Sequence, residues 1–478
     1  MLIAFETLSH IILTLALGYY LITALQWYNY RIKRVIFHFH KPKWHLLFFI
    51  IPVMVYYLAG IWVWIYLYLA YLPWLVVWAR KLDKKLVFTS RIKRFFGFLL
   101  FATILQNALC LISPACENFG LLLPLIASVI LSAFYEKILF KGFYNQAKST
   151  LTSNPNLKII AITASYGKTS IKNFLFHILS KEFKCYNTPR SVNTIGGLVQ
   201  DVNSGLPKDC QIYIAEAGAR ERGDIAQIAS FLEPHIAIIG QIGPQHIEYF
   251  KTLEAIRNTK MELIHSPRLE YGFVHVSTNA IPSGVIKSFG NELKEVDASL
   301  DGTRFSIELD GEIYWFETKL LGAFNAQNLL ACIHVARSLG MSIEAIQEAI
   351  KSLAPVAHRL NPMRVGGKLI LDDSYNGNRE GMEASYHLVA THKGRKILIT
   401  PGIIESTPEE NQSLAKVMDR VFDIVIITGS ANAQILLKEL KRPKVHLLKD
   451  KSQLESLLAK ESASGDLILF SNDAPSFI

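Results

Sequence analysis

The sequence predicts an α/β protein that begins with a helical transmembrane region and continues into two α/β domains. Long apolar runs crowd the first 150 of the 478 residues, and from Lys158 onward short β-rich runs alternate with helical stretches. Such alternation is typical of parallel sheets covered by helices. We therefore expect a transmembrane region over 1–150, a central domain over 151–355 and a C-terminal domain over 356–478.

Three apolar runs, residues 3–25, 95–113 and 119–136, each approach the roughly 20 residues that a membrane span needs. A fourth run, residues 45–79, is too long for one helix across a core of about 30 Å. Basic clusters flank it on both sides, and such clusters stay on the cytoplasmic side of a membrane. An even number of crossings must then separate them, so we expect a hairpin that turns near Ala59-Gly60.

These runs predict five crossings of the inner, cytoplasmic membrane, with membrane lipid as a partner and the N-terminus outside. Lys137, Lys141 and Lys148 follow the last run and place both α/β domains in the cytoplasm. A buried helical hairpin in a soluble domain is the alternative for the 45–79 run.

The positive charge of the chain is concentrated in its first third. Residues 1–150 hold fifteen Lys or Arg against four Asp or Glu, whereas residues 151–478 hold 35 against 36. The net charge of +10 is therefore no nucleic-acid signature, and we expect no nucleic-acid partner. The five cysteines form no CxxC pair, which suggests neither a zinc site nor a disulfide framework.

Nine β-rich runs mark the strands of the two α/β domains. The central domain has KIIAIT, QIYIAEAG, HIAIIGQIG and GFVHVST, with helical stretches at 170–181 and 252–265. The C-terminal domain has KLILDDS, KILITPG, DIVIITG, KVHLLKD and DLILFSN. Pro355 and Pro362 mark the boundary between the two series.

The stretch AITASYGKTS, residues 161–170, is similar to a phosphate-binding loop between a strand and a helix. The N–H groups and the dipole of a helix that begins near Lys168 would favour an anion. Lys168 would neutralise the terminal phosphates, and the Thr169 hydroxyl would hold Mg²⁺.

The loop departs from the strict GxxxxGK[ST] pattern. Ile162 stands where the first glycine should be, and Ala161 and Ala164 occupy positions that such loops usually fill with glycine. The strand expected before the loop and the helix expected after it nevertheless favour a phosphate site.

Two further side chains follow strands expected in the same sheet. Glu216 ends the run YIAE, and His246 follows the run IIGQIG. Ligands gather at the carboxyl ends of parallel strands, so both side chains can reach a metal near Thr169. Either residue alone is as easily a surface carboxylate or a loop histidine, and it is their joint spacing that favours a Mg²⁺ site.

Taken together, six motifs resemble those of the Mur ligases in their order along the chain. They are TASYGKTS, EAGARERGDI, IGPQHIEYF, GAFNAQNLLA, HRL and LDDSYNGNREGMEAS. The resemblance covers about residues 155–478, and DDSYNGN is most similar to the branch that adds D-alanyl-D-alanine to the peptidoglycan precursor. It implies a P-loop Mur-ligase ATPase domain followed by a Rossmann-like C-terminal domain.

The activity that the resemblance implies is ATP-dependent amide ligation in peptidoglycan precursor synthesis. D-alanyl-D-alanine would be joined to the muramoyl peptide carboxylate of UDP-N-acetylmuramoyl-tripeptide through an acyl phosphate, with ATP and Mg²⁺ as cofactors. Alternatives are a Mur-type ligase for another amine or a lipid-linked carboxylate, and a membrane ATPase or transporter. The sequence leaves the oligomeric state open, a monomer included.

The resemblance also implies roles for particular residues. The catalytic residues would be Lys168, His246 and Lys260, the last of them carbamylated. ATP would meet a larger set, Ser165, Gly167, Lys168, Thr169, Ser170, Asn325, Asn328, Arg359 and Asp373. Mg²⁺ would be held by Thr169, Glu216 and His246, and the substrates would meet Asn193, Asn376 and Asn378.

Two departures from the family concern the nucleotide and the sugar. Phe324 stands where a histidine commonly precedes the first asparagine of FNAQN. The small domain that usually grips the uridine diphosphate sugar is replaced by the expected membrane crossings. The nucleotide sugar would then be held by other surfaces, or the carboxylate substrate would be a different one.

Overall fold

The chain folds into two compact units, a helical unit over Met1–Phe143 and an α/β unit over Tyr144–Ile478. The computed structural model describes residues 2–28, 30–37, 41–82, 84–112, 120–245, 247–375, 377–404, 406–448 and 450–472.

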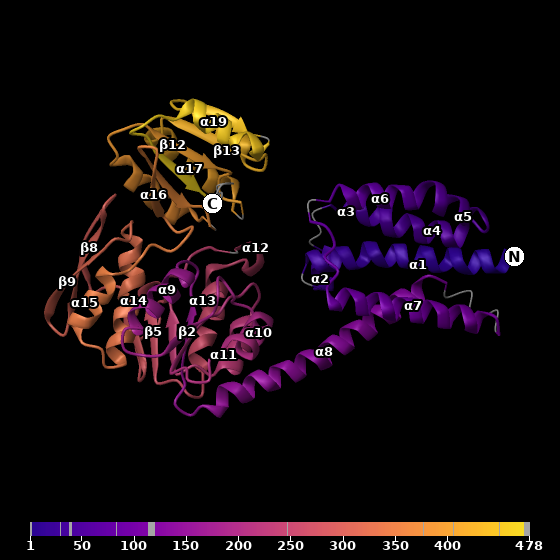
Figure 1. Cartoon of the computed structure of the whole chain (residues 1–478), viewed down its shortest axis with the longest axis horizontal. Coiled ribbons are helices and arrows are strands. Elements are labelled where there is room, and N and C mark those ends of the chain that lie inside the picture. The colour runs from indigo at the N-terminus through magenta and orange to yellow at the C-terminus, as the bar shows by residue number, and fades with distance from the viewer. Residues whose placement is uncertain are drawn as a thin grey trace. The chain divides into compact units, whose positions relative to one another are not determined.

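The helical unit consists of helices throughout its regular structure (Figure 1). They are α1 (Leu2–Trp27), α2 (Ile32–Phe37), α3 (Pro42–His45), α4 (Ile51–Leu58), α5 (Trp62–Tyr66), α6 (Leu72–Arg80), α7 (Ser90–Cys110) and the start of α8 (Leu122–Ser153). Helix α1 lies between the α3–α6 segment and α7 (Figure 1), and it contacts both. It is therefore the best buried helix of the unit.

The long apolar run divides into two helical stretches near Ala59-Gly60, as the sequence predicts. Gly60 has a φ of +54°, and the Tyr71 hydroxyl donates to the Phe48 carbonyl across the hairpin at 3.0 Å. In the part of the chain that the structure describes, four helices are long and apolar enough to cross a membrane, Ile3–Trp27, Trp62–Arg80, Ser90–Cys110 and Leu122–Ser153, and Pro42–Leu58 is a shorter apolar helix.

The cysteines depart from the expectation at one position. Cys110, the last residue of α7, is disulfide-bonded, so the absence of a CxxC pair was a poor guide there. Cys185, Cys210 and Cys332 are free thiols, as expected.

The central domain is built on a six-stranded parallel sheet of order β2-β3-β1-β4-β5-β6. Its strands are β1 (Lys158–Thr163), β2 (Cys185–Asn187), β3 (Ile212–Glu216), β4 (Ile236–Ile239), β5 (Tyr271–His275) and β6 (Ile286–Phe289). Its helices are α9 (Lys168–Leu179), α10 (Ile195–Gly205), α11 (Asp224–Leu232), α12 (Ile247–Phe250), α13 (Leu253–Met261), α14 (Phe324–Ser338) and α15 (Ile343–Lys351). Strand β1 lies between β3 and β4, so the loops after all three strands meet at one edge of the sheet.

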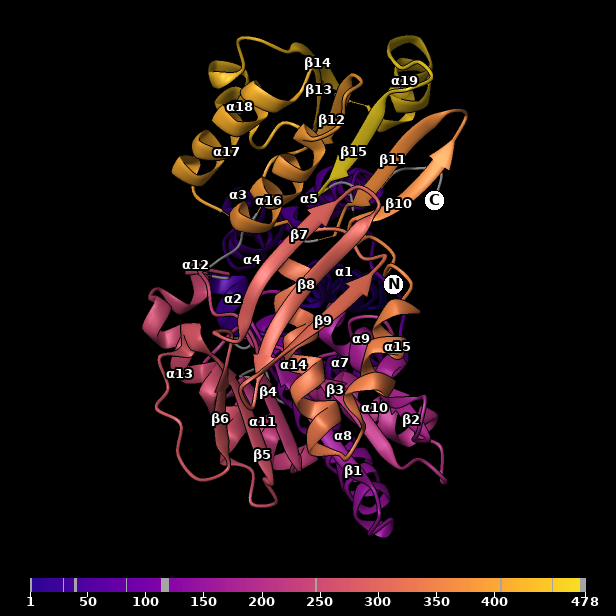
Figure 2. The same cartoon turned by 90° about the vertical axis from the view of Figure 1, so that its left-hand side faces the viewer.

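A separate antiparallel sheet, absent from the sequence prediction, follows β6 (Figure 2). It consists of β7 (Leu293–Ser299), β8 (Gly302–Leu309) and β9 (Glu312–Thr318). Asp310 and Gly311 both have positive φ and form the tight turn between β8 and β9. An Asp-Gly pair between alternating strands is a strong hairpin signal, and the sequence prediction overlooked it.

The C-terminal domain holds a second six-stranded sheet of order β10-β11-β15-β12-β13-β14. Its strands are β10 (Asn361–Val365), β11 (Lys368–Asp373), β12 (Lys396–Thr400), β13 (Ile424–Thr428), β14 (Lys444–Leu448) and β15 (Leu467–Ser471). Only the β10–β11 pair is antiparallel. The helices are α16 (Arg379–Ala390), α17 (Pro408–Val421), α18 (Ala433–Glu439) and α19 (Leu454–Glu461). All nine predicted strands are present, and the predicted parallel α/β fold is confirmed.

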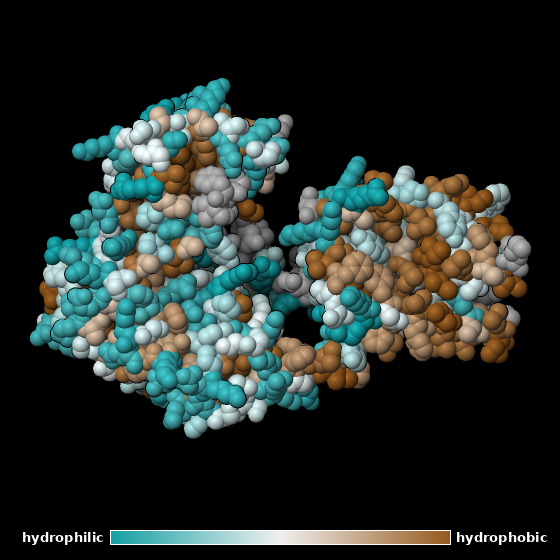
Figure 3. Space-filling view, viewed as in Figure 1, coloured by the Kyte–Doolittle hydropathy of each residue, from teal (hydrophilic) through white to brown (hydrophobic). Residues whose placement is uncertain are grey.

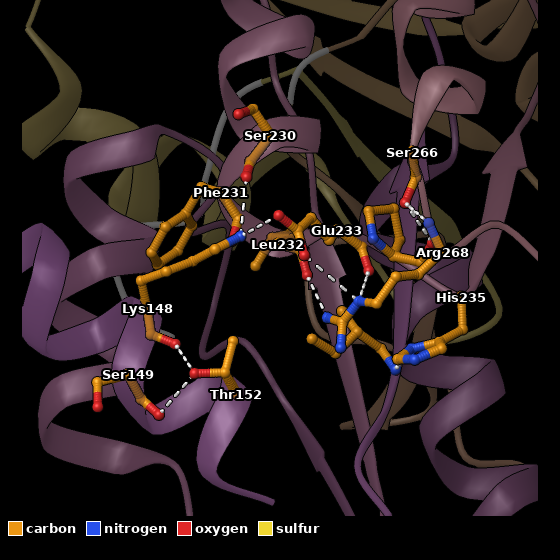
Figure 4. Close-up of polar contacts among 12 residues, drawn as sticks. Lys148, Ser149, Thr152, Ser230, Phe231, Leu232, Glu233, His235, Ser266 and Arg268 are labelled. Carbon is orange, nitrogen blue, oxygen red and sulfur yellow. Dashed lines mark hydrogen bonds and ion pairs between the residues drawn. The ribbon is translucent and has the colours of Figure 1, made fainter. Parts of the chain in front are cut away.

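The last turns of α8 belong to the α/β unit and pack on the end of α11 (Figure 4). The Lys148 ammonium donates to the carbonyls of Ser230 and Phe231, both at 3.0 Å, and pairs with Glu233 at 2.7 Å. Arg268 approaches the other carboxylate oxygen of Glu233 at 3.5 Å. Cations at a helix C-terminus satisfy its free carbonyls and oppose its dipole.

Candidate active site

The phosphate loop has the backbone that its sequence predicts. Gly167 has a φ of +77° and caps α9, which begins at Lys168. The Asn328 side chain lies so close to Gly167 that a Cβ there would come within 2.4 Å of Asn328 Oδ1. Glycine is the residue that adopts this positive φ readily and leaves room for the Asn328 side chain. The free N–H groups at the start of α9 form an anion site at the carboxyl end of β1.

The alanines in the loop are accommodated by their neighbours. Ala164 is fully buried, and a Cβ on Gly240 would come within 2.9 Å of the Ala164 Cβ. Ala164 has a methyl group where such loops usually have glycine, and Gly240 has no side chain that would occupy the same space. Ala161 lies in β1 between Ala215 of β3 and Ala237 of β4, where a small side chain fits.

Lys168 is turned into the phosphate loop. Its ammonium donates to the Ala164 carbonyl at 2.7 Å. Burial lowers the pKa of Lys168 to about 8, with Glu216 opposing and Arg359 adding to the shift. An anionic phosphate would offset that burial, because it favours the charged form of the amine.

The structure brings the predicted magnesium ligands Thr169 and Glu216 together. The Thr169 hydroxyl donates to Glu216 Oε2 at 3.2 Å, and Lys172 lies 2.9 Å from Oε1. Mg²⁺ prefers hard oxygen ligands and often takes only one or two from the protein, with phosphate and water completing its shell. A hydroxyl and a carboxylate beside a phosphate site fit that requirement. His246, the third predicted ligand, lies outside the described residues.

Lys260 lies in the last turn of α13 and is 4% exposed. Burial holds the pKa of Lys260 well below its ordinary value, and the charge of Lys168 lowers it further. Burial and the nearby Lys168 charge thus both disfavour the charged form of the Lys260 amine.

A cavity of about 200 Å³ is lined by both domains of the α/β unit. The central domain contributes Tyr166, Gly167, Ser170, Gln241, Phe324 and Asn328. The C-terminal domain contributes Arg359, Asp373, Tyr375, Gly377, Asn378, Glu380, Gly381 and Met382. The carboxyl end of β11 and the start of α16 therefore face the phosphate loop.

Arg359 and Asp373 bring opposite charges to this cavity. Arg359 Nη1 donates to the Tyr375 carbonyl at 3.0 Å, and its guanidinium lies 4.5 Å from the centre of the Tyr375 ring. Asp373 accepts a hydrogen bond from the Ser385 hydroxyl at 2.8 Å. Burial raises the pKa of Asp373, while Ser385 and Arg359 oppose the rise.

Several predicted residues serve the scaffold in this structure. Asn325 is buried and donates to the Leu321 carbonyl at 2.8 Å, so of the two predicted adenine contacts only Asn328 lines the cavity. Ser165 donates to the Gly243 carbonyl at 2.9 Å. Asn378 lines the cavity but caps α16 by accepting from Gly381 N at 2.9 Å.

Of the other two predicted substrate residues, the structure describes only Asn193. The backbone carbonyl of Asn193 accepts from Gly218 N at 2.8 Å, and its side chain lies against Gly218, two residues after Glu216. Asn376 lies outside the described residues.

The sequence prediction missed Tyr166, Gln241 and Tyr375. Gln241 Nε2 donates to Glu380 Oε2 at 3.2 Å, which joins the two domains beside the cavity. Tyr166 and Tyr375 stand inside quoted motifs, and an aromatic ring between functional residues was the available signal. Gln241 gave none, because its partner comes from 139 positions away.

The phosphate loop, the Thr169–Glu216 pair and the shared cavity define a two-domain nucleotide-dependent enzyme. Residues 162–336 match the Mur ligase middle domain, and residues 358–472 match the Mur ligase glutamate ligase domain. These two matches cover more than half of the chain. The chain belongs to the Mur ligase family of ATP-dependent ligases.

Individual proteins point to one branch of the family. The UDP-N-acetylmuramoyl-tripeptide–D-alanyl-D-alanine ligase of Bacillus subtilis (strain 168) is 25% identical over 66% of this chain and 72% of its own. The same ligase of Treponema pallidum (strain Nichols) is 32% identical over 49% of this chain and 52% of its own, so the chain spans about half of that relative. MurF of Thermotoga maritima, solved with ADP, has the same fold, with a TM-score of 0.61, 24% identity and coverage of 70% and 80%.

Proposed function

We propose that the protein is an ATP-dependent amide ligase of the MurF type. It joins D-alanyl-D-alanine to UDP-N-acetylmuramoyl-tripeptide, the reaction named for the Bacillus subtilis and Treponema pallidum relatives. The observation that carries the proposal is the cavity between a phosphate loop and the strand ends of a second domain. Such a cavity holds a nucleotide against a second reactant and excludes water when the domains close.

The proposed chemistry balances in two steps. A substrate carboxylate oxygen attacks the γ-phosphorus of ATP, the bond from that phosphorus to the β–γ bridging oxygen breaks, and the products are an acyl phosphate and ADP. The amine of D-alanyl-D-alanine then attacks the acyl carbon, releasing phosphate and a proton and forming the amide. Lys168 and the N–H groups of α9 offset charge on the phosphate oxygens, and Arg359 adds a second cation. Mg²⁺ held by Thr169 and Glu216 would neutralise further phosphate charge.

Carbamylation of Lys260 is part of this proposal. Carbon dioxide reacts with an uncharged amine and releases one proton, and the lowered pKa of Lys260 supplies that amine. The carbamate formed on Lys260 carries a negative charge in place of the positive charge of the ammonium. A negative charge there would help to hold Mg²⁺. Mass spectrometry of the intact chain in bicarbonate tests the carbamylation. We expect the added mass of one carbon dioxide in the unaltered chain and no such addition in Lys260→Met.

We further propose that the helical unit crosses the cytoplasmic membrane and places the α/β unit in the cytoplasm. Four long apolar helices, the shorter apolar helix Pro42–Leu58 as a fifth crossing, and the basic clusters of the sequence support this orientation. The disulfide of Cys110 supports it independently. With the basic clusters inside, the end of α7 faces outward, where disulfides persist.

Phosphate release by the detergent-purified chain tests the proposed reaction. ATP, Mg²⁺ and UDP-N-acetylmuramoyl-tripeptide are supplied with and without D-alanyl-D-alanine. We expect release that requires both substrates. ATP turnover that ignores them would contradict the proposed substrates and direct the search to another amine or a lipid-linked carboxylate.

A further inference from the structure

Lys172 is a buried cation that none of the roles above uses. It lies about one turn after Lys168 on α9, and its side chain is 1% exposed. Its ammonium lies 2.9 Å from Glu216 Oε1 and donates to the carbonyls of Thr188, at 2.6 Å, and Arg190. The two carbonyls take two of the three donors of the ammonium, and its contact with Glu216 Oε1 is an ion pair, because Oε1 makes no hydrogen bond within the described residues. A buried charge is tolerated only when it is paired and hydrogen-bonded in this way.

The two oxygens of Glu216 have different partners as a result. Oε1 meets the Lys172 ammonium, whereas Oε2 accepts from the Thr169 hydroxyl at 3.2 Å. Glu216 is fully buried, so it has little freedom to exchange the two oxygens. A cation at Thr169 would therefore meet a single oxygen of Glu216, while the other stays with Lys172.

The same ammonium fastens the 188–193 segment to the site. Arg190 has a φ of +51°, a conformation that costs a non-glycine residue and persists where its surroundings hold it. The segment ends at Asn193, whose carbonyl accepts from Gly218 N two residues beyond Glu216. Lys172 thus joins three parts of the site: the phosphate-loop helix, the carboxylate and the segment that carries Asn193.

We propose that Lys172 is a positioning residue that presents Glu216 to a divalent cation through one oxygen and anchors the 188–193 segment beside it. The inference rests on the proposed function, because it takes Thr169 and Glu216 to hold a nucleotide-bound cation. The arrangement resembles the outer partners of metal ligands in other proteins, which orient a ligand without touching the metal.

Binding of Mn²⁺ in the presence of ADP, measured by electron paramagnetic resonance on the detergent-purified full chain, tests this role. Mn²⁺ takes the same oxygen ligands as Mg²⁺. We expect Lys172→Met to weaken Mn²⁺ binding by about 10- to 100-fold, and we expect a loss at least as large in Glu216→Gln. Binding of ADP in EDTA should stay close to that of the unaltered chain. Lys184→Met is the matched control, because the Lys184–Asp209 pair is equally close at 2.9 Å but exposed.

The double variant Lys172→Met/Glu216→Gln separates positioning from packing. If Lys172 affects Mn²⁺ only by holding Glu216 so that Oε2 faces the cation, removing Lys172 adds nothing once Glu216 is changed. The double variant should then bind Mn²⁺ no more weakly than Glu216→Gln alone. Should Lys172→Met fail to fold while the double variant folds, the pairing is again supported, because the single change strands a buried carboxylate.

Three results would overturn the role. They are Mn²⁺ affinity unchanged in Lys172→Met, an equal loss of ADP affinity in EDTA, and a double variant that also fails to fold. If the unaltered chain binds ADP with no Mn²⁺ dependence, the proposed function fails together with this inference. If ADP binding depends on Mn²⁺ equally in the unaltered chain and in Lys172→Met, the inference fails and the proposed function stands.

Discussion

The two units of the chain expose opposite kinds of surface. Among the described residues, 38 exposed large apolar or aromatic side chains lie in the helical unit and 12 in the α/β unit. Figure 3 shows the contrast as brown over much of the face of the helical unit and teal over the α/β unit. In the α/β unit, strands such as β1, β3 and β13 are buried along nearly their whole length. Apolar residues therefore form the core of the α/β unit but much of the outer surface of the helical unit. An apolar surface of that extent is unfavourable in contact with water.

The largest expected effect concerns that outer surface. We expect the full chain to stay with the membrane pellet after alkaline carbonate extraction, because its exposed apolar helices match a bilayer core. A fragment starting at Tyr144, which keeps the contacts of Lys148, should appear in the supernatant. Immunoblots of both fractions measure this. Release of the full chain by carbonate would refute the membrane proposal.

Removing the phosphate-loop cation should be the next largest effect, and it should be confined to the α/β unit. Lys168→Ala removes the ammonium that faces the phosphates, and we expect phosphate release to fall by about a hundredfold or more. Its membrane fractionation should not change. Lys184→Met, in an exposed pair, should leave the rate near that of the unaltered chain. Equal rates in the two variants would contradict the assigned site.

The lowered pKa of Lys168 predicts a pH dependence of nucleotide binding. Above pH about 8 the amine loses its proton, so ADP affinity in EDTA should fall by at most about tenfold per pH unit. Binding should be accompanied by proton uptake in that range. Calorimetry in two buffers of different ionisation enthalpy measures it. The slope should disappear in Lys168→Ala, and a slope that persists there must come from another group.

The smallest expected effect tests the alanine in the phosphate loop. Gly240→Ala would push a methyl group against Ala164, and we expect a loss of about 1–3 kcal/mol in the free energy of unfolding. Exchanging the two residues, as Ala164→Gly/Gly240→Ala, should recover much of that loss. Thermal unfolding of the α/β fragment measures both. A double variant as unstable as Gly240→Ala would show that the two positions do not share their space.

The comparison of the units also shows what the sequence could predict. Buried parallel strands are continuous apolar runs, so the nine strands could be read directly, whereas the break at Ala59-Gly60 followed from the length of the 45–79 run and the basic clusters on both sides of it. The β7–β9 sheet alternates polar and apolar residues and was overlooked, although Asp310-Gly311 marked its turn. Within the site, Lys168 and Thr169 begin the helix that follows β1 and Glu216 ends β3, and all three were found from their place in the sequence. Lys172 and Gln241 act through partners that only the fold brings near.

Formation of the amide product by the full chain and by the α/β unit alone, followed by mass spectrometry, decides whether the chemistry lies in the α/β unit. The full chain in detergent and the Tyr144–Ile478 fragment would each receive ATP, Mg²⁺, UDP-N-acetylmuramoyl-tripeptide and D-alanyl-D-alanine. We expect the same product from both, because the phosphate loop and the cavity lie within the α/β unit. Product from the full chain and none from a folded fragment that still binds ADP would contradict that division.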